Sequence, residues 1–443
     1  MALPNCDLPG FAVVEILLRL PVKLLLRFRA VSKGWCEFIT SPDFARMYLA
    51  HQLAGSAPST HSLLLRESDS RSVTSISTSP VPVSNLEESG EVLFPLSKTA
   101  LRFPFHLGSD YVNDFRVDGC CNGLVCVSLN HTVNLNASRK IVIWNPATTK
   151  YRIIDVPEGA PFEVASSELA TWKNITLCGG VSTYLGFGYS PESNDYKLLR
   201  VWNMPGFANQ RNSFLVWVYA FSAGTWKLIS CNFRYLLTGS TPTIVNGCMH
   251  WYNSKKIIVF DIGKEEFRKM AVPRTDGSIE RQLVCINGCL SLVAFDKHGC
   301  SAFEVWVLGD YHNSASWFKR FTVTYASLAP PKLVGCWKND ELLFQNSKNL
   351  LSCDLLSGSF ECLQSLDSEA DATIFNYFET FESVYGRGVR ELQTNDSPSM
   401  MGYGGPTKAQ KSSREKQEKG ETQTDGSKKK KDNFLSVGFK LKL

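Results

Sequence analysis

The spacing of hydrophobic residues changes once along the chain, near residue 60. In residues 1–52, apolar side chains recur at the i, i+3, i+4 and i+7 positions of a helical face. Pro21 would end the first helix, and Ser41 followed by Pro42 has the residue types of an N-cap and a first helical turn. The first face consists of Val13, Ile16, Leu17 and Leu20.

Two more faces with helical spacing follow in the same segment. The pattern predicts about three or four short helices with a thin core, which would need a partner for stability. The first additional face consists of Val31, Trp35, Phe38 and Ile39, and the second of Phe44, Met47, Tyr48 and His51.

From residue 61 onward, short runs of β-branched and aromatic residues alternate with Gly, Asn, Asp, Ser and Pro, which predicts strands joined by turns. One unit recurs roughly every 40–50 residues: an apolar run, a polar turn, then an aromatic and usually a basic residue. A strand–turn–strand segment, often containing Asn-Gly, precedes most units. The units are 141–154, 216–229, 257–270, 303–321 and 349–363, and their closing aromatic residues are Tyr151, Trp226, Phe267, Trp317 and Phe360.

Four short strands in a repeat of this length are typical of a β-propeller blade, and the lack of helices between them argues against a parallel α/β fold. We expect about six blades, with seven as the alternative. Residues 61–68 and 372–381 should pair and close the ring, whereas residues 68–90 and 157–180 should be loops. The predicted fold class is multidomain, with a small α-helical part followed by an all-β propeller.

Basic residues concentrate at the C-terminus. Residues 408–443 hold eleven Lys or Arg and five Asp or Glu, although the whole chain carries a formal net charge of +5, so the remainder is close to neutral. This argues against a nucleic-acid-binding body, and no run of about 18 apolar residues predicts a membrane span. We expect a cytoplasmic or nuclear protein with a disordered basic tail over 386–443. The lysines at 428–431 would be a nuclear-import patch or part of a solvated tail.

Cysteines and histidines lack the spacing of metal ligands. The 14 cysteines include no Cys-x-x-Cys pair with a downstream His, so we expect reduced core thiols and no zinc site. Of the histidines, His250 and His298 fall near predicted strands, whereas Asp261 and Asp354 occupy turns. We therefore predict no catalytic residue, metal or cofactor. A propeller enzyme of galactose-oxidase-like or glycosidase-like type, which needs converging metal ligands or a carboxylate pair, is the runner-up class.

Residues 8–52 resemble an F-box, and residues 61–385 resemble the F-box-associated, kelch-like β-propeller interaction domain of plant F-box proteins. The propeller resemblance rests on CCNGLVCV, IVIWNPATTKYRII, LGFGYSPESNDYKLLRV and VNGCMHWY. The F-box resemblance rests on Leu8-Pro9, Glu15-Ile16-Leu17, Arg19-Leu20-Pro21-Val22-Lys23, Leu25-Leu26-Arg27-Phe28-Arg29, Val31-Ser32-Lys33, Trp35, Ile39, Ser41-Pro42 and Phe44. The resulting domains are an F-box at 1–52, a linker at 53–60, a propeller at 61–385 and a tail at 386–443.

The resemblance implies the substrate-recognition subunit of an SCF-type ubiquitin ligase. The F-box would bind a Skp-type adaptor and through it a cullin, and the propeller would bind a protein target without any bond chemistry of its own. A non-degradative scaffold or sensor bound to the adaptor is the alternative. Target-binding residues stay unassigned, with 203–213 and 309–316 as candidate loops. The adaptor-binding residues that the resemblance implies are Leu8, Pro9, Ile16, Leu20, Pro21, Leu25, Val31 and Trp35.

The chain departs from the family pattern at Gly10-Phe11-Ala12, where the family usually has acidic residues followed by leucine. An acidic residue there would cap the first helix, so its loss is expected to weaken adaptor binding. At Leu24 the family commonly has Ser, which makes this surface more apolar. Lys23, Arg27 and Lys33 are expected at the rim of the adaptor-binding surface.

Overall fold

A computed structural model describes fifteen segments of the chain. The chain divides into two units, Met1–Glu391 and Leu392–Leu443, and every described residue belongs to the first. The expected tail beyond residue 387 therefore lies outside the described residues. The described segments are 10–54, 62–67, 73–78, 96–101, 115–129, 140–156, 182–204, 213–229, 241–275, 278–296, 302–325, 332–337, 341–346, 349–366 and 372–387.

Residues 10–54 form four short helices, as the hydrophobic spacing predicted. The Ser41 hydroxyl accepts a hydrogen bond from the Phe44 backbone N–H (3.2 Å) and Pro42 occupies the first turn, so the predicted cap is confirmed. Ser32 caps the preceding helix in the same way, through the Trp35 backbone N–H (3.2 Å). The helices are α1 (Gly10–Leu18), α2 (Val22–Phe28), α3 (Lys33–Ile39) and α4 (Pro42–Leu53).

All three predicted helical faces are wrong in part, and in the first of them Ile16 is exposed. Val31 precedes α3 and is exposed, because Ser32 is extended and ends the preceding turn before the helix begins. In α4, Met47 is exposed whereas Tyr48 and Gln52 are buried. The buried stripe of α4 thus includes a polar residue that hydrophobic spacing does not identify.

Five sheets each consist of four consecutive antiparallel strands. The first contains β4 (Phe115–Cys121), β5 (Leu124–Leu129), β6 (Lys140–Asn145) and β7 (Lys150–Asp155), and the second β8 (Ser182–Ser190), β9 (Asp195–Met204), β10 (Ser213–Ala220) and β11 (Thr225–Ile229). The third contains β12 (Thr243–Val245), β13 (Cys248–Asn253), β14 (Lys256–Asp261) and β15 (Glu266–Met270). The fourth contains β16 (Ser278–Ile286), β17 (Cys289–Asp296), β18 (Ala302–Leu308) and β19 (Trp317–Thr324), and the fifth β20 (Lys332–Cys336), β21 (Leu342–Asn346), β22 (Asn349–Cys353) and β23 (Phe360–Ser365).

The sixth sheet joins the two ends of the β region. It contains β1 (Ser62–Glu67), β2 (Val73–Thr78), β3 (Leu96–Leu101) and β24 (Ala372–Tyr377), in the order β24-β1-β2-β3. Its register runs from Ser62 opposite Tyr377 to Glu67 opposite Ala372, which confirms the predicted pairing. The Ser-rich stretch 68–90 was expected to be a loop, but it contains β2. The β-branched residues of its VTSIST sequence suit a strand, and β1 and β3 supply the backbone partners.

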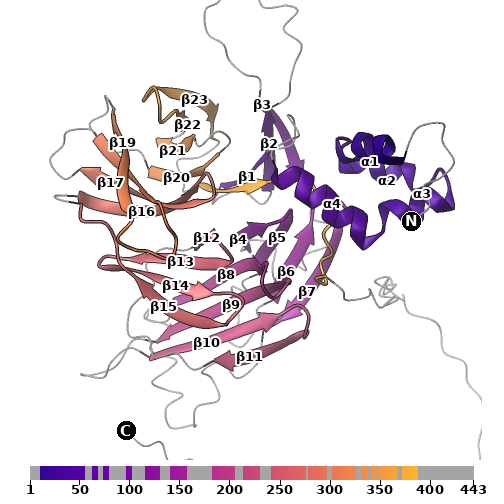
Figure 1. The fold of residues 1–443 in the computed structure, drawn as a ribbon, viewed down its shortest axis with the longest axis horizontal. Helices are drawn as coiled ribbons and strands as arrows, with labels where there is room; N and C mark the ends of the chain where they lie inside the picture. Colours follow the sequence, from indigo (N-terminus) through magenta and orange to yellow (C-terminus); the bar gives the residue numbers. More distant parts are fainter. Residues whose placement is uncertain are drawn as a thin grey trace, which may run out of the picture. The chain divides into compact units, whose positions relative to one another are not determined.

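The sheets follow one another in a ring, with the first strand of each sheet on the inside. Inner strand β4 lies next to β8, β12 next to β16, and β16 next to β20. Strand β24 contacts both β20 and β4, so the sixth sheet fills the position between the fifth and the first. In Figure 1 the sheet of β12–β15 lies between the sheets of β8–β11 and β16–β19. This arrangement is a β-propeller.

The repeated sequence units are the outer hairpins of five sheets, and they are confirmed as strand pairs. Residues 141–154, for example, form the β6–β7 hairpin, and residues 257–270 form β14–β15. Three Asn-Gly turns precede them, and both residues of each turn have positive φ, as a two-residue hairpin of matching twist requires. These turns are Asn122-Gly123, Asn246-Gly247 and Asn287-Gly288.

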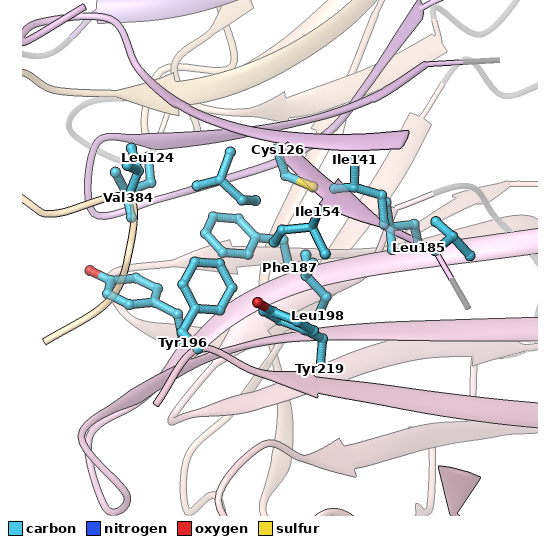
Figure 2. Packing of buried hydrophobic residues seen from close by; sticks show 13 residues of the cluster. Leu124, Cys126, Ile141, Ile154, Leu185, Phe187, Tyr196, Leu198, Tyr219 and Val384 are labelled. Atoms are coloured by element: carbon cyan, nitrogen blue, oxygen red, sulfur yellow. The ribbon is translucent and has the colours of Figure 1, made fainter. Parts of the chain in front are cut away.

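The hydrophobic core lies between neighbouring sheets rather than within any one of them. Figure 2 shows Leu124 and Cys126 of the first sheet facing Phe187, Leu198 and Tyr219 of the second. All five side chains are buried. Each sheet therefore depends on its neighbours for stability, which explains why no single repeat carries a complete core. Among the cysteines, Cys126 behaves as the small core residue that the sequence predicted.

Candidate functional site

Exposed apolar side chains concentrate in the helical part of the protein. Among the described residues, six of the ten exposed large hydrophobic side chains belong to residues 10–54, although this segment is a small part of the structure. A contiguous apolar surface of this kind is typical of a protein-interaction site, so these side chains are the candidates for one. The six side chains are Phe11, Ile16, Leu24, Val31, Met47 and Leu53.

Three of the predicted adaptor-binding residues contribute to this surface. Ile16 on α1 is 49% exposed and Val31, before α3, is 68% exposed. Pro21 is also exposed and occupies the N-cap position of α2. Leu8 and Pro9 lie outside the described residues. Ile16, Pro21 and Val31 are thus available to a partner.

The other predicted residues lie deeper. Leu20 and Trp35 are half-buried, and the Trp35 ring packs on Phe28 with centroids 6.2 Å apart. Leu25 is completely buried in the core that the four helices share. It cannot offer contact area to a partner in this conformation. The prediction included Leu25 because helical periodicity identifies an apolar face but not the side chains that cover it. The contribution of Leu25 here is to the fold of the helical unit.

Four of the six exposed apolar residues, Phe11, Leu24, Met47 and Leu53, were not predicted as site residues. Phe11 is 75% exposed and Leu24 is 38% exposed. Both stand where the chain is more apolar than the family pattern, so the signal that could have identified them was present. Lys23, Arg27 and Lys33 are also exposed.

A concave region lies inside the ring. A cavity of about 470 Å³ is lined by β12, β13, β16, β20 and β24, and a neighbouring one of about 220 Å³ shares part of this lining. Arg281 lines the larger cavity and donates hydrogen bonds to the Tyr252 hydroxyl and the Thr275 carbonyl, both at 2.9 Å. Asp118 lines the smaller one, and burial raises the pKa of its carboxyl group, with Arg116 opposing that effect.

His250 also lines the larger cavity, but its ring is fully engaged. Its Nδ1 lies 3.0 Å from the Thr243 carbonyl oxygen and its Nε2 lies 2.9 Å from the Tyr311 hydroxyl. Burial lowers the pKa of His250 to about 4, so the ring is neutral at physiological pH. A neutral ring with both nitrogens occupied is a structural element of the sheet rather than a poised base.

The described residues contain no group of three or more His, Cys, Asp or Glu that could hold a metal ion. His298 lies outside them. Asp261 and Asp354 fix turns, as predicted: the Asp261 carboxylate accepts from the Lys264 backbone N–H (2.9 Å), and the Asp354 carboxylate from that of Leu356 (3.0 Å). These carboxylates therefore serve backbone geometry.

One of the two candidate target loops is described, and it is held by its own side chains. In the turn 309–316, the Ser316 hydroxyl accepts a hydrogen bond from the Asp310 backbone N–H (2.8 Å) and donates to the Asn313 carbonyl (2.7 Å). Tyr311 turns inward to His250. The other loop, 203–213, is described only at its ends. The turn 309–316 is thus a preformed surface feature between β18 and β19.

Comparison with protein families decides the identity of the two parts. The model for the F-box associated beta propeller domain matches residues 102–374, which is more than half of the chain, and the model for the F-box domain matches residues 5–47. The chain belongs to the F-box proteins with an F-box-associated β-propeller. Its helical unit is the F-box, and the ring of sheets is the associated propeller.

Relatives of this F-box protein are found in Arabidopsis thaliana. F-box protein CPR1 is 24% identical, and the alignment covers 98% of this chain and 99% of the relative. F-box/kelch-repeat protein At3g23880 is 25% identical over 72% of this chain and 79% of the relative. Among solved structures, apo AztD from Citrobacter koseri aligns at 9% identity and a TM-score of 0.33, over 73% of this chain and 99% of that chain. In the described part of the F-box protein, no helix is long and apolar enough to cross a membrane.

Proposed function

We propose that this F-box protein is the substrate-recognition subunit of an SCF-type ubiquitin ligase. The F-box helices bind a Skp-type adaptor, which connects them to a cullin, and the propeller binds a protein target. The protein catalyses no reaction. It raises the local concentration of target lysines near a ubiquitin-loaded enzyme, an effect that needs tethering and orientation alone.

The observation that carries this proposal is the exposed apolar surface of the F-box. Ile16 and Val31, two apolar side chains of the F-box, are 49% and 68% exposed. Exposed apolar surface is typical of a protein-interaction site. Phe11 and Leu24 are further exposed apolar side chains of the F-box. The adaptor-binding surface that we propose therefore consists of Phe11, Ile16, Pro21, Leu24 and Val31, with Leu8 and Pro9 from the family pattern.

We further propose that the six sheets are six blades and that the sixth, β24-β1-β2-β3, closes the ring. The inner position of β24 between β20 and β4 supports this number over seven. We place the F-box at 1–52, a linker at 53–60 and the propeller at 61–385. The basic tail follows, and we place the protein in the cytoplasm, the nucleus or both.

A comparison of two double variants tests the proposed function. Ile16→Asp with Val31→Asp puts charge on the F-box surface, and Leu228→Asp with Phe318→Asp puts the same charge on similarly exposed propeller residues (51% and 48%). Both proteins are co-expressed with a Skp-type adaptor and a cullin, with the proteasome blocked. The F-box variant should lose the adaptor and cullin and should leave propeller-bound proteins without ubiquitin, whereas the propeller variant should keep both ligase subunits. Retention of the adaptor by both variants would refute the proposed surface.

A further inference from the structure

Ten residues that follow the last strand connect the propeller to the F-box. Residues 378–387, which we call the strap, leave the sheet after β24 and include the buried residues Thr380, Glu382 and Val384. Phe381 from the strap joins the hydrophobic core of the F-box helices, together with Ala147 from the β6–β7 turn. The F-box core is therefore completed by propeller residues.

The contact between the strap and α4 is aromatic. The Phe381 ring meets the Phe44 ring edge-on at 5.8 Å and the Tyr48 ring edge-on at 5.3 Å. Tyr48 in turn donates a hydrogen bond from its hydroxyl to the Leu20 carbonyl (3.0 Å), in the turn between α1 and α2. Edge-to-face geometry is a favourable arrangement for aromatic pairs, and Phe381 sits beside two of the largest buried side chains of the F-box.

A second contact completes helix α2. Its N-cap residue, Pro21, provides no side-chain hydrogen bond, and its first turn contains no acidic residue. The Glu379 carboxyl group of the strap lies near the Val22 backbone N–H and near Lys23, and burial raises its pKa against the effect of both groups. It places a hydrogen-bond acceptor at a helix N-terminus whose own sequence provides none.

The strap is anchored on the propeller by buried hydrogen bonds. The Asn145 side-chain amide donates to the Thr380 carbonyl (3.1 Å) and to the Glu382 carbonyl (2.9 Å). The Thr380 hydroxyl donates to the Asn122 carbonyl (2.7 Å), and the Tyr196 hydroxyl donates to the Glu382 carboxylate (2.8 Å). Asn145 and Asn122 belong to the first sheet and its turn, and Tyr196 to the second, so two sheets hold the strap.

The order of elements along the chain links these contacts to ring closure. Helix α4 leads into β1, β1 pairs with β24, and the strap follows β24. Phe381 and Phe44 are far apart in sequence, so bringing them together closes a long loop at an entropic cost. The β1–β24 pairing closes this loop and offsets that cost. Separation of β1 from β24 would remove the pairing that brings α4 and the strap together.

We propose that the strap makes completion of the F-box conditional on closure of the propeller. A chain whose propeller has not closed would lack part of the F-box core and the acceptor at α2. If the proposed function holds, the protein would then present its adaptor-binding surface at full affinity only when its target-binding domain is folded. By linkage, a ligand that stabilises the closed ring would also stabilise the F-box.

Two glycines in equivalent turns allow a matched test on the full-length protein. Gly123 and Gly288 both follow Asn in hairpin turns, with φ of +78° and +72°, so alanine introduces similar backbone strain at each. A Cβ on Gly123 would lie 2.7 Å from the Phe378 carbonyl oxygen and 2.5 Å from the Thr380 hydroxyl, both in the strap. A Cβ on Gly288 would meet nothing within 4 Å. Gly123→Ala thus displaces the strap from the propeller side without touching a helix.

Hydrogen exchange of the backbone amides, measured without any adaptor, is the readout. We expect amides of α2 and α4 to exchange at least about tenfold faster in Gly123→Ala than in Gly288→Ala, with strands β12–β23 protected in both. Phe381→Ala removes the ring beside Phe44 and Tyr48. It should speed the exchange of the α4 amides and leave the exchange of the strand amides unchanged.

Wild-type protection of α2 and α4 in Phe381→Ala would overturn the proposal, as would equal helix exchange in the two glycine variants. If Gly123→Ala does not fold, as unprotected strand amides would show, Phe381→Ala decides alone. Because no adaptor is present, failure here is distinct from failure of the proposed function, which the co-expression experiment reports.

Discussion

The indole N–H of Trp226 donates a hydrogen bond to the backbone carbonyl of Asp155 at 2.9 Å, across the boundary between the first two sheets of the propeller. Trp317 makes the same contact with Ala271 (3.1 Å), between the third and fourth sheets. Both tryptophans are closing aromatic residues of the sequence repeat. In these two units the repeat therefore encodes a contact between neighbouring sheets as well as the hairpin itself.

Trp226→Phe should keep most of the ring packing and lose this hydrogen bond. We expect the free energy of unfolding to fall by about 1 kcal/mol, the usual net value of one such bond, as measured by urea denaturation. Amides at the facing edges of β7 and β11 should exchange faster. Trp306→Phe is the control, because the Trp306 indole bonds Glu304 within its own strand (3.0 Å) and should leave the junction between the first two sheets unchanged. Unaltered exchange in Trp226→Phe would show that the bond does not join the sheets.

The Glu265 carboxylate forms ion pairs with two lysines of the second sheet, and these two lysines differ in burial. The Lys197 amine lies 2.8 Å from one carboxylate oxygen with its side chain 7% exposed, and the Lys227 amine lies 3.0 Å from the other with its side chain 69% exposed. Burial alone would raise the pKa of Glu265, but the two lysines lower it below its usual value. We expect Lys197→Ala to cost about 3 kcal/mol of unfolding free energy and Lys227→Ala less than about 1 kcal/mol, because exposed ion pairs are weak. Equal losses in urea denaturation would contradict this assignment.

The buried His250 predicts how stability depends on pH. Its pKa of about 4 lies below the value of about 6.5 in an unfolded chain, so between these values the unfolded state binds the extra proton. The free energy of unfolding should therefore fall as the pH is lowered from 6.5 towards 4, by up to about 1.4 kcal/mol per pH unit. The groups that face the ring are the Thr243 carbonyl, the Tyr311 hydroxyl and Arg268.

His250→Asn removes this titration. Its stability should be lower than that of the wild type at pH 7 and should change less between pH 6.5 and 4, as followed by thermal unfolding. Parallel pH profiles for the two proteins would mean that His250 does not take up the proton.

Helix α1 begins at Gly10 and has no acidic residue in its first turn. Gly10→Asp should strengthen the helix by about 0.5–1 kcal/mol, since Asp is favoured at an N-terminus and Gly is a poor helix former. If α1 contributes to the adaptor-binding surface in a helical state, adaptor affinity should rise several-fold, as measured by calorimetric titration. An unchanged or lower affinity would mean that the departure from the family pattern at Gly10-Phe11-Ala12 does not weaken docking.

Much of the propeller could be predicted from sequence because its signals are local. An Asn-Gly pair between two apolar runs, as at Asn246-Gly247, determines a hairpin through the positive φ that these residues tolerate. The recurrence of such hairpins then gives the repeat. The strand β2 was missed because serine and threonine in VTSIST resemble a loop, and the pairing that stabilises the strand comes from β1 and β3.

The strap could not be predicted, because its partners are remote in sequence. Nothing near Phe381 indicates that its ring belongs to the F-box core, and nothing near Pro21 indicates that Glu379 supplies the missing acceptor. The same limit applies to Leu25 and Val31, which both carry apolar side chains in the F-box pattern. One is completely buried and the other largely exposed, and the difference arises from how the four helices pack.

Titration of purified Skp-type adaptor into the full-length protein and into two single variants shows whether the F-box surface binds an adaptor. Ile16→Asp changes a residue of the proposed surface, and Leu228→Asp changes a propeller residue of nearly equal exposure (49% and 51%). We expect tight binding by the wild type and by Leu228→Asp, and at least about a hundredfold loss of affinity for Ile16→Asp, because burying an unpaired charge in an interface costs several kcal/mol. Equal affinities for the two variants, or no binding by the wild type, would contradict the proposed adaptor binding.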